Sequence, residues 1–385
     1  MKINKISSLI IIFCLFGCSS TQPESASTFT PVPTNTFQPT ETPKPLPTST
    51  SVSQPETTAS EITITSKDKQ IIIRGLAGNS YSLTWSEDGQ KLFIGSQKNG
   101  LVIYDVETKK VTINPIDDLL ISSLALKTLT VSLDFSDIYG NINARFIKSE
   151  TGNFIKNISL TNDSRIGISN LIFSPNGKIL VSLIYNKGIQ IISWDIASGK
   201  KIKELFKADL GDSISGLAFS PDGNSLIAGF SKGFFKEKTF MVWDTNTWEL
   251  QRTFNGGDLG PDSDLSFSPD GSRFATAGGS GIHEANIWDF NTGEKLFSLG
   301  IQRWGEAITY DPSGKYIASG GLGGDDGIHT IIIYDANTGK PIHELVAGVY
   351  GTLALAYSPD GTKLAANGHE GEQTSTVIIW DMNQP

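Results

Sequence analysis

The chain has 385 residues, of which 38% are hydrophobic and 18% charged, so most of it can fold around apolar cores. Its 31 Lys and Arg against 40 Asp and Glu give a formal net charge of −9, which argues against a nucleic-acid ligand because phosphates need a basic surface. Both cysteines, Cys14 and Cys18, fall within the first twenty residues. The rest of the chain therefore excludes disulfides, thiolate metal sites and a cysteine nucleophile.

The N-terminal residues 1–17 have the pattern of an export signal. Lys2 and Lys5 precede an apolar run over 9–16 that is too short to remain as a membrane-spanning helix. The segment Leu15-Phe16-Gly17-Cys18 resembles the lipobox of bacterial lipoproteins. This resemblance implies that Cys18 carries the lipid, and that the protein is extracytoplasmic and anchored to a bacterial cell membrane.

A tether is predicted over residues 18–60, beginning with the lipidated cysteine. Ser, Thr and Pro make up most of this segment, which contains few large apolar residues. Such a composition cannot bury a core and predicts an extended, disordered chain. The folded domain is therefore predicted over 61–385.

Two motifs recur along this domain. One is Ser-Pro-Asp-Gly or a close variant, whose glycines are Gly89, Gly177, Gly223, Gly271, Gly314 and Gly361. The other is an aromatic residue followed by aspartate, at Asp105, Asp195, Asp244, Asp289, Asp335 and Asp381. Successive glycines lie 43 to 48 residues apart, except for a first interval of 88 that spans two periods. The spacing predicts seven units of about 46 residues, the second of them degenerate.

Each unit is predicted to contain four strands. Leu217-Ala218-Phe219 alternates at period two before a Ser-Pro-Asp-Gly turn, in which Pro presets a negative φ and Gly accepts a positive one. A second strand, a third strand ending in the aromatic-Asp pair, a Thr-Gly turn and a fourth strand complete the unit. Seven such units predict an all-β fold, a seven-bladed β-propeller.

These repeated residues resemble the WD-repeat family of propellers over about 61–385. The Gly-His dipeptide usual in that family is missing from its usual place ahead of the first strand in every unit, which indicates a divergent bacterial version. The last unit lacks a fourth strand of its own after Asp381. The segment 70–74 contains three consecutive isoleucines and lies before the first unit, so it is predicted to pair into the last blade and close the ring.

A partner-binding surface is predicted on the face that carries the loops between the second and third strands, which lengthen in the last four units. Aromatic residues and Arg, the usual anchors of protein interfaces, gather there. The candidates are Tyr81, Phe234, Phe235, Arg303, Trp304 and Tyr350. The alternative is that these rings pack down to cover the blades.

Metal and catalytic motifs are weaker. His283, His329 and His369 lie in corresponding places of three units and could ligate a cation, although repeat similarity explains them equally. Asp258, Asp262 and Asp264 crowd one loop but lack the spacing of a calcium site. Residues 229–233 match Gly-x-Ser-x-Gly, yet they end a predicted strand rather than beginning a helix.

The sequence thus predicts a non-catalytic, lipid-anchored platform that binds unidentified protein partners and needs no cofactor. The alternative is a propeller enzyme, similar to a lactonase or a glycan lyase, with a metal or polar site at the central mouth. Fold class alone does not separate these functions. An enzyme would require polar groups that converge on the axis, whereas the first strands of the units end mainly in Ser, Leu and aromatic residues.

Overall fold

The computed structural model describes residues 62–383, except for 68, 79, 97, 115–128, 135–141, 149–152, 162–166, 186–187, 210, 233–237, 257–263, 322–329, 348–349 and 370–373. The chain divides into two units, Met1–Glu56 and Thr57–Pro385, and every described residue belongs to the second. The regular structure of these residues is β-strand, which confirms the all-β class. They contain no helix long and apolar enough to cross a membrane.

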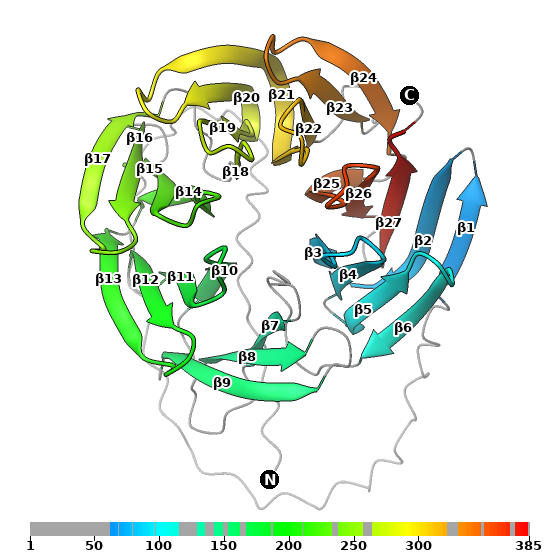
Figure 1. Ribbon diagram of the computed structural model, residues 1–385, viewed down its shortest axis with the longest axis horizontal. Helices are drawn as coiled ribbons and strands as arrows, with labels where there is room; N and C mark the ends of the chain where they lie inside the picture. The colour runs from blue at the N-terminus through cyan, green and yellow to red at the C-terminus, as the bar shows by residue number, and fades with distance from the viewer. Residues whose placement is uncertain are drawn as a thin grey trace, which may run out of the picture. The chain divides into compact units, whose positions relative to one another are not determined.

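The strands form six antiparallel sheets (Figure 1). The first repeat unit comprises β3 (Ser80–Trp85), β4 (Lys91–Ser96), β5 (Gly100–Asp105) and β6 (Lys110–Asn114). The second comprises the three strands β7 (Leu129–Asp134), β8 (Ile142–Lys148) and β9 (Phe154–Thr161). The third comprises β10 (Gly167–Phe173), β11 (Ile179–Tyr185), β12 (Ile189–Asp195) and β13 (Lys201–Ala208). The fourth comprises β14 (Ser213–Phe219), β15 (Ser225–Ser231), β16 (Lys238–Asp244) and β17 (Leu250–Asn255).

The fifth and sixth units share one seven-stranded sheet. Its strands are β18 (Leu265–Phe267), β19 (Arg273–Thr276), β20 (Gly279–Asp289), β21 (Lys295–Tyr310), β22 (Tyr316–Gly321), β23 (Thr330–Asp335) and β24 (Pro341–Val346). The 16-residue strand β21 is the last strand of the fifth unit and the first strand of the sixth. The sequence pattern predicts two separate strands here, and the two are continuous because residues 301–305 pair with 279–284 of β20.

The last sheet has five strands, β25 (Tyr350–Tyr357), β26 (Lys363–His369), β27 (Thr374–Asp381), β2 (Gln70–Ala77) and β1 (Thr63–Lys67). Strand β2 pairs with β27 from Gln70 opposite Trp380 to Ala77 opposite Thr374. The outer strand β1, which the sequence pattern does not predict, pairs with the other edge of β2. The two ends of the described chain therefore share one sheet.

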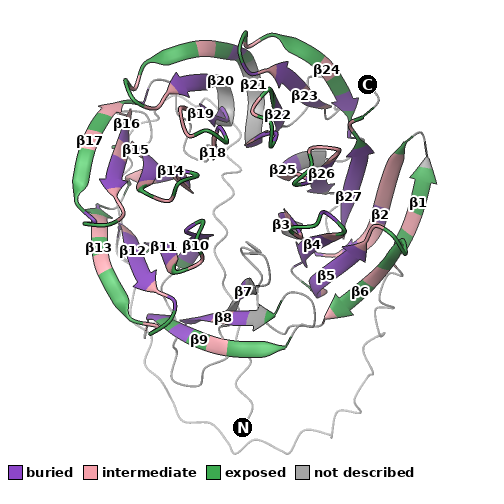
Figure 2. Ribbon diagram, viewed as in Figure 1, coloured by how far each residue is buried: buried purple, intermediate pink, exposed green. Residues whose placement is uncertain are grey.

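Apolar clusters are shared between neighbouring sheets. One joins the fourth and fifth units through Ile227, Phe240, Val242, Leu265, Phe274 and Trp288. Another joins the last sheet to the first unit, with Ile73, Leu76, Leu83, Leu92, Val377 and Ile379. The outer strands such as β9, β13 and β17 carry most of the exposed residues (Figure 2). Because neighbouring units bury one another, each sheet depends on the next for its core.

The turn between the first two strands is closed by a repeated set of hydrogen bonds. In the fourth unit, Asp222 accepts hydrogen bonds from Ser220 Oγ at 2.5 Å and from Asn224 N at 3.0 Å. Ser220 Oγ in turn accepts one from Ser225 N at 2.9 Å. The hydrogen bond from the Ser220 hydroxyl, with that from Asn224 N, holds the pKa of Asp222 below its ordinary value.

Both short turns of a unit lie at the same end of its sheet. In the fourth unit, Thr245 N in the second turn donates to Asn224 O beside the first turn at 3.0 Å. The same backbone bond joins Val106 to Gln90, Ile196 to Lys178, Phe290 to Ser272, Ala336 to Lys315 and Met382 to Thr362. We call this the turn end of the units. The opposite end, where the first strands begin, is the loop end.

Candidate functional site

The predicted partner-binding residues fall in two groups. Phe234 and Phe235 lie outside the described residues. Tyr81, Arg303, Trp304 and Tyr350 lie in strands β3, β21 and β25, where the backbone is described and the side chains are not. Tyr81 and Tyr350 are at the starts of their strands, at the loop end. Arg303 and Trp304 lie in the part of β21 that joins the fifth unit to the sixth and pairs with β20.

The registers bring some of the candidate residues together. Tyr350 is directly opposite His369 in the pair β25–β26. Arg303 is opposite Ile282, and the neighbouring His283 is opposite Gln302, in the pair β20–β21. His329 lies outside the described residues. Among the side chains that are described, no three His, Cys, Asp or Glu gather in a way that could hold a metal ion.

The ladders at the loop end are irregular. Register shifts interrupt the first-strand pairing of β3, β10, β14, β21 and β25. In β3 the unpaired residue is Tyr81, since Ser80 and Ser82 pair with Ser96 and Gly95. A bulge bends the strand and redirects the side chains beside it, and bulges are over-represented next to functional sites. Register shifts also occur between the third and fourth strands beside the turns, so what is particular to the loop end is the irregular pairing of the first strands.

Asp264 is a titratable group at the loop end. Its carboxylate accepts hydrogen bonds from Leu265 N at 2.8 Å and from Ile308 N at 3.2 Å, which ties β18 to β21. Burial raises the pKa of Asp264 to about 6, and the two backbone hydrogen bonds oppose that rise. Asp258 and Asp262, its neighbours in the calcium interpretation, lie outside the described residues. Asp264 therefore links two units.

The Gly-x-Ser-x-Gly match has no nucleophile geometry in its described part. Gly229 and Ser231 lie in strand β15, opposite Phe240 and Lys238 of β16. Ser231 is buried, at 2% exposure. A nucleophile elbow needs a sharp turn from a strand into a helix, with the hydroxyl exposed. The interpretation of this segment as an ordinary second strand is confirmed.

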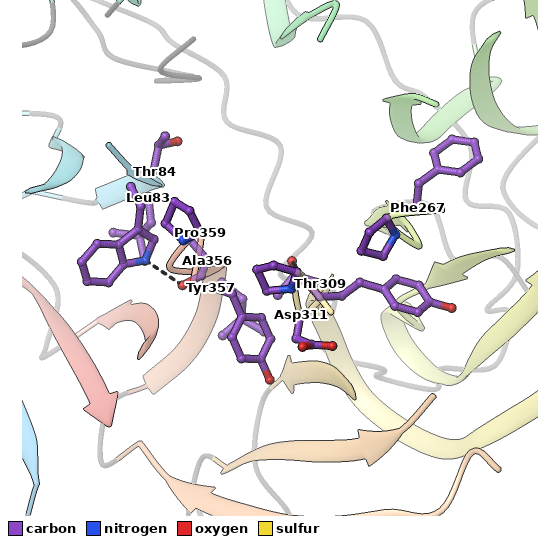
Figure 3. A pocket seen from close by; sticks show the side chains of 13 residues that line it. Leu83, Thr84, Phe267, Thr309, Asp311, Ala356, Tyr357 and Pro359 are labelled. Carbon is purple, nitrogen blue, oxygen red and sulfur yellow. Dashed lines mark hydrogen bonds between the residues drawn. The ribbon is translucent and has the colours of Figure 1, made fainter. Parts of the chain in front are cut away.

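A cavity of about 320 Å³ lies at the turn end, among the first strands of several units (Figure 3). Four first strands contribute their last residues, all aromatic, namely Trp85, Phe267, Tyr310 and Tyr357. Three turn prolines, Pro269, Pro312 and Pro359, also line the cavity. The Trp85 indole donates a hydrogen bond to Ala356 O at 3.0 Å across two units. The sequence pattern identifies these residues as turns and core, and does not predict a cavity.

Among the described residues that line this cavity, Asp311 is the only charged one. It stands where five other units have serine, in an Asp-Pro-Ser-Gly turn. This departure from the repeat is visible in the sequence, but the cavity beside it follows only from the arrangement of the units.

Residues 199–244, which cover the end of the third unit and most of the fourth, match the family described as WD domain, G-beta repeat. An uncharacterized WD repeat-containing protein of Synechocystis is 38% identical over 65 residues, or 17% of each chain. Guanine nucleotide-binding protein subunit beta of Solanum tuberosum is 24% identical over 241 residues, 58% of this chain and 59% of its own. Its counterpart in Arabidopsis thaliana is 23% identical over 269 residues, 64% of this chain and 67% of its own. Together with the recurring antiparallel sheets, these matches support the WD-repeat family for this chain.

Proposed function

We propose that this protein is a lipid-anchored, extracytoplasmic β-propeller with seven blades, which acts as a non-catalytic platform for protein partners. Its parts are a signal peptide over 1–17, a lipidated Cys18 with a tether to residue 60, and a propeller over 61–385. The observation that carries the platform role is the run of WD-like units, because WD-repeat proteins bind protein partners. The irregular loop end, with its candidate aromatic and Arg residues, is the surface we assign to binding.

Ring closure through the N-terminal strand is supported by contacts between the first and last units. Strand β2 supplies the strand beside β27, and Trp85 donates to Ala356 O. A Cβ placed on Gly89 in the first turn would lie 3.6 Å from Pro359 Cδ in the last. The second unit and the shared sheet of the fifth and sixth then complete seven blades.

Deletion of N-terminal residues tests the closure. Removing residues 1–60 should leave the melting temperature unchanged, because the tether contributes no core. Removing 1–76 deletes β1 and nearly all of β2, with the buried Ile73 and Leu76, and should expose an edge of β27. We expect a lower melting temperature and aggregation, measured by thermal unfolding and light scattering. Equal stability of the two variants would contradict closure.

The lipid anchor is tested at Cys18. A Cys18→Ser variant loses the thiol that would carry the lipid, so it should leave the membrane fraction and lose metabolic fatty-acid labelling. Cys14→Ser is the matched control and should stay membrane-bound and labelled. Continued labelling of the Cys18→Ser protein would contradict the lipobox assignment.

Partner binding at the loop end is tested with Trp304. Truncating an interface anchor typically costs about 2 kcal/mol or more in binding. Once a partner has been isolated, Trp304→Ala should weaken its binding about tenfold or more and leave the melting temperature nearly unchanged. Asp222→Asn, at the turn end, should leave the affinity alone. Unfolding of the Trp304→Ala protein would instead assign this ring to the core.

The alternative, a propeller enzyme with a metal at its mouth, has a direct test. Metal analysis of the purified protein after dialysis should find no stoichiometric metal if the platform is correct. A bound metal that is lost on changing His283, His329 or His369 to Ala would favour the enzyme.

A further inference from the structure

The turn of the sixth unit exchanges the places of its serine and its aspartate. Five units have Ser at the first turn position, and that position is buried in four of them, with Ser174, Ser220, Ser268 and Ser358 exposed by at most 5%. The carboxylate of the ordinary turn is at the third position, which is exposed, as with Asp222. The sixth unit instead has Asp311 first and Ser313 third. Asp311 is buried, at 6% exposure, and Ser313 is exposed.

The exchanged turn keeps its hydrogen bonds. Asp311 Oδ2 accepts from Ser313 N at 3.0 Å and from Ser313 Oγ at 2.5 Å, and Asp311 Oδ1 accepts from Tyr316 N at 2.7 Å. In the ordinary turn the serine hydroxyl accepts the bond that corresponds to the last of these, as Ser220 does from Ser225 N. Either order therefore closes the turn. The exchange moves the negative charge from the exposed third position of the turn to its buried first position.

The first position of this turn, which Asp311 occupies, borders the cavity at the turn end. Asp311 is the only charged residue in the part of the cavity lining that the structure describes (Figure 3). No Lys, Arg or His in the described ranges forms an ion pair with it. A buried carboxylate is costly unless a cation or several donors compensate it, and three donors leave a carboxylate about one acceptor site to fill. A turn closed by serine would avoid this cost, so the stability of the turn does not explain the exchange.

The other lining residues suit the apolar stem of a cationic side chain. Three turn prolines bring apolar rings to the cavity, and Trp85, Phe267 and Tyr357 also line it, with the rings of Phe267 and Tyr357 turned outward from its centre in Figure 3. Apolar walls of this kind pack against the methylene chain of a Lys or Arg side chain. The Tyr357 hydroxyl has no hydrogen-bond partner among the described residues. Burial, with the negative charge of Asp311, raises the pKa of Tyr357, so this hydroxyl stays neutral and lies close enough to feel that charge.

We propose that the cavity at the turn end is a second binding site, in which Asp311 takes up the guanidinium or ammonium group of an Arg or Lys side chain from a protein partner. The proposal rests on the proposed platform function, and it places this contact at the end of the units opposite the candidate loop-end residues. The overall charge of −9 favours the approach of a basic partner.

The size of the cavity favours a side chain over a free small molecule. At about 320 Å³ and open to solvent, it is at the lower limit of small-ligand sites, which enclose most of their ligand. One long side chain can fill such a space while the rest of the partner rests on the surrounding turns. We therefore assign the cavity to a side chain of a protein partner, and the group it binds is a single organic cation.

The test restores the ordinary order of serine and aspartate in the turn of the sixth unit. Asp311→Ser combined with Ser313→Asp restores the Ser-Pro-Asp-Gly order, with the same composition and net charge, and moves the carboxylate outward. The probes are N-acetyl-arginine amide, N-acetyl-lysine amide and the neutral N-acetyl-citrulline amide, titrated into the full-length protein and followed by ligand-observed NMR. We expect the native protein to bind at least one of the two cations and not citrulline. The exchanged variant should bind that cation about tenfold more weakly or worse, at an unchanged melting temperature.

The matched control makes the converse exchange in the fourth unit, Ser220→Asp with Asp222→Ser, away from this cavity. It should leave cation affinity unchanged. Equal affinity of the exchanged and native proteins, equal binding of citrulline, or an equal loss in the control would each overturn the site at Asp311.

A partner-capture arm separates this proposal from the platform function. Crosslinked partners of the native protein are compared with those of the exchanged variant and of Trp304→Ala. Loss of a partner on exchange, together with loss of probe binding, supports the site. A partner that depends on Trp304 alone, with no probe binding by the native protein, overturns the site and leaves the platform standing. If the probe cation binds through Asp311 but the protein captures no partner, both the assignment of the ligand to a protein side chain and the platform function are overturned.

Discussion

At the turn end, the aspartate carboxylates accept hydrogen bonds from nearby amides and hydroxyls, whereas at the loop end Asp264 lies half-buried between two units. The first arrangement lowers the pKa of the carboxyl group and the second raises it. The lowered group comprises Asp88, Asp105, Asp195, Asp222, Asp244, Asp270, Asp289, Asp335 and Asp360. The raised one is Asp264, with a pKa of about 6. One residue type thus serves two purposes, closing turns at one end and linking neighbouring units at the other.

These shifts predict opposite dependences of stability on pH. The turn carboxylates stabilise the fold above their unfolded pKa of about 3.9, and this contribution is lost as the pH falls through their lower folded values. The contribution of Asp264 is fully present below about pH 3.9 and is lost as the pH rises through about 6. The hydrogen bonds of the turn carboxylates therefore contribute most to stability at neutral pH, whereas the link at Asp264 contributes most in mild acid. The free energy of unfolding should therefore be greatest between about pH 4 and 6.

The largest effect is expected from Gly293→Ala, which breaks a turn at the turn end. Gly293 has φ +75°, and a Cβ there would lie 2.5 Å from Phe254 Cγ. Arg252 holds the same turn by donating to Phe290 O and Asn291 O, so the turn cannot easily move away. We expect a loss of about 3 kcal/mol or more in the free energy of unfolding, measured by denaturant titration.

Gly199→Ala is the matched control for this change. Gly199 occupies the same turn position in the third unit with φ +70°, but its nearest neighbour to a Cβ is Ile158 Cγ1 at 3.6 Å. It should cost only the left-handed strain, about 1–2 kcal/mol. Equal costs for the two changes would show that Phe254 yields to the added methyl group.

Asp264→Asn should give the next largest effect and would sharpen the pH contrast. An amide keeps an oxygen that can accept from Ile308 N or Leu265 N, while the buried charge is removed. We expect stability to rise by about 1–2 kcal/mol at pH 8, with the partial exposure of this residue discounted, and to be nearly unchanged at pH 4. Urea unfolding from pH 4 to pH 8 would measure the difference. A variant that keeps the native slope between pH 4 and 6 would assign the slope to another group.

The smallest change in stability is expected at the tryptophans that precede the final aspartate of the third strands. In the third and fifth units the indole N–H donates to a hydroxyl, from Trp194 to Ser182 at 2.8 Å and from Trp288 to Thr276 at 3.1 Å. In the last unit the corresponding residue is Ala366, and Trp380 Nε1 is buried with no hydrogen-bond partner among the described residues.

Ala366→Ser should supply the missing acceptor and stabilise the protein by about 1 kcal/mol. Ser182→Ala, the reverse change in the third unit, should destabilise it by about the same amount or more. Both are measured by denaturant titration at pH 7. A loss of stability in the Ala366→Ser protein would mean that the hydroxyl crowds the space around Trp380.

Much of the fold could be predicted because the repeat is encoded locally. A Ser-Pro-Asp-Gly turn after alternating apolar residues specifies a hairpin without reference to the rest of the chain, and strands β14 and β15 follow it. The apolar residues of 70–74 likewise indicate a strand that needs an edge to pair with. Strand β1 is mostly polar and exposed, and the apolar alternation around it is limited to Ile62 and Ile64, which is too short to mark a strand beside the polar tether.

Less of the candidate site could be predicted. Arg303 and Trp304 follow a glycine, Gly300 at φ +95°, which favours a loop, but pairing with β20 continues the strand beyond it. The cavity beside Asp311 depends on residues from four strands, from β3 near the start of the domain to β25 near its end, and no local pattern contains that arrangement. The exchange of Ser and Asp in one turn is the single sequence signal that points to it.

The continuous strand β21 has a consequence for how the domain opens. In the other units the last strand of one unit and the first strand of the next are separate strands. In β21 the backbone from Lys295 to Tyr310 is paired throughout its length on one side or the other, apart from the bulges. The fifth and sixth units should therefore unfold as one cooperative block. In hydrogen exchange, the amides of 301–305 should share the slow rates of both units, and a circular permutation cut there should be poorly tolerated.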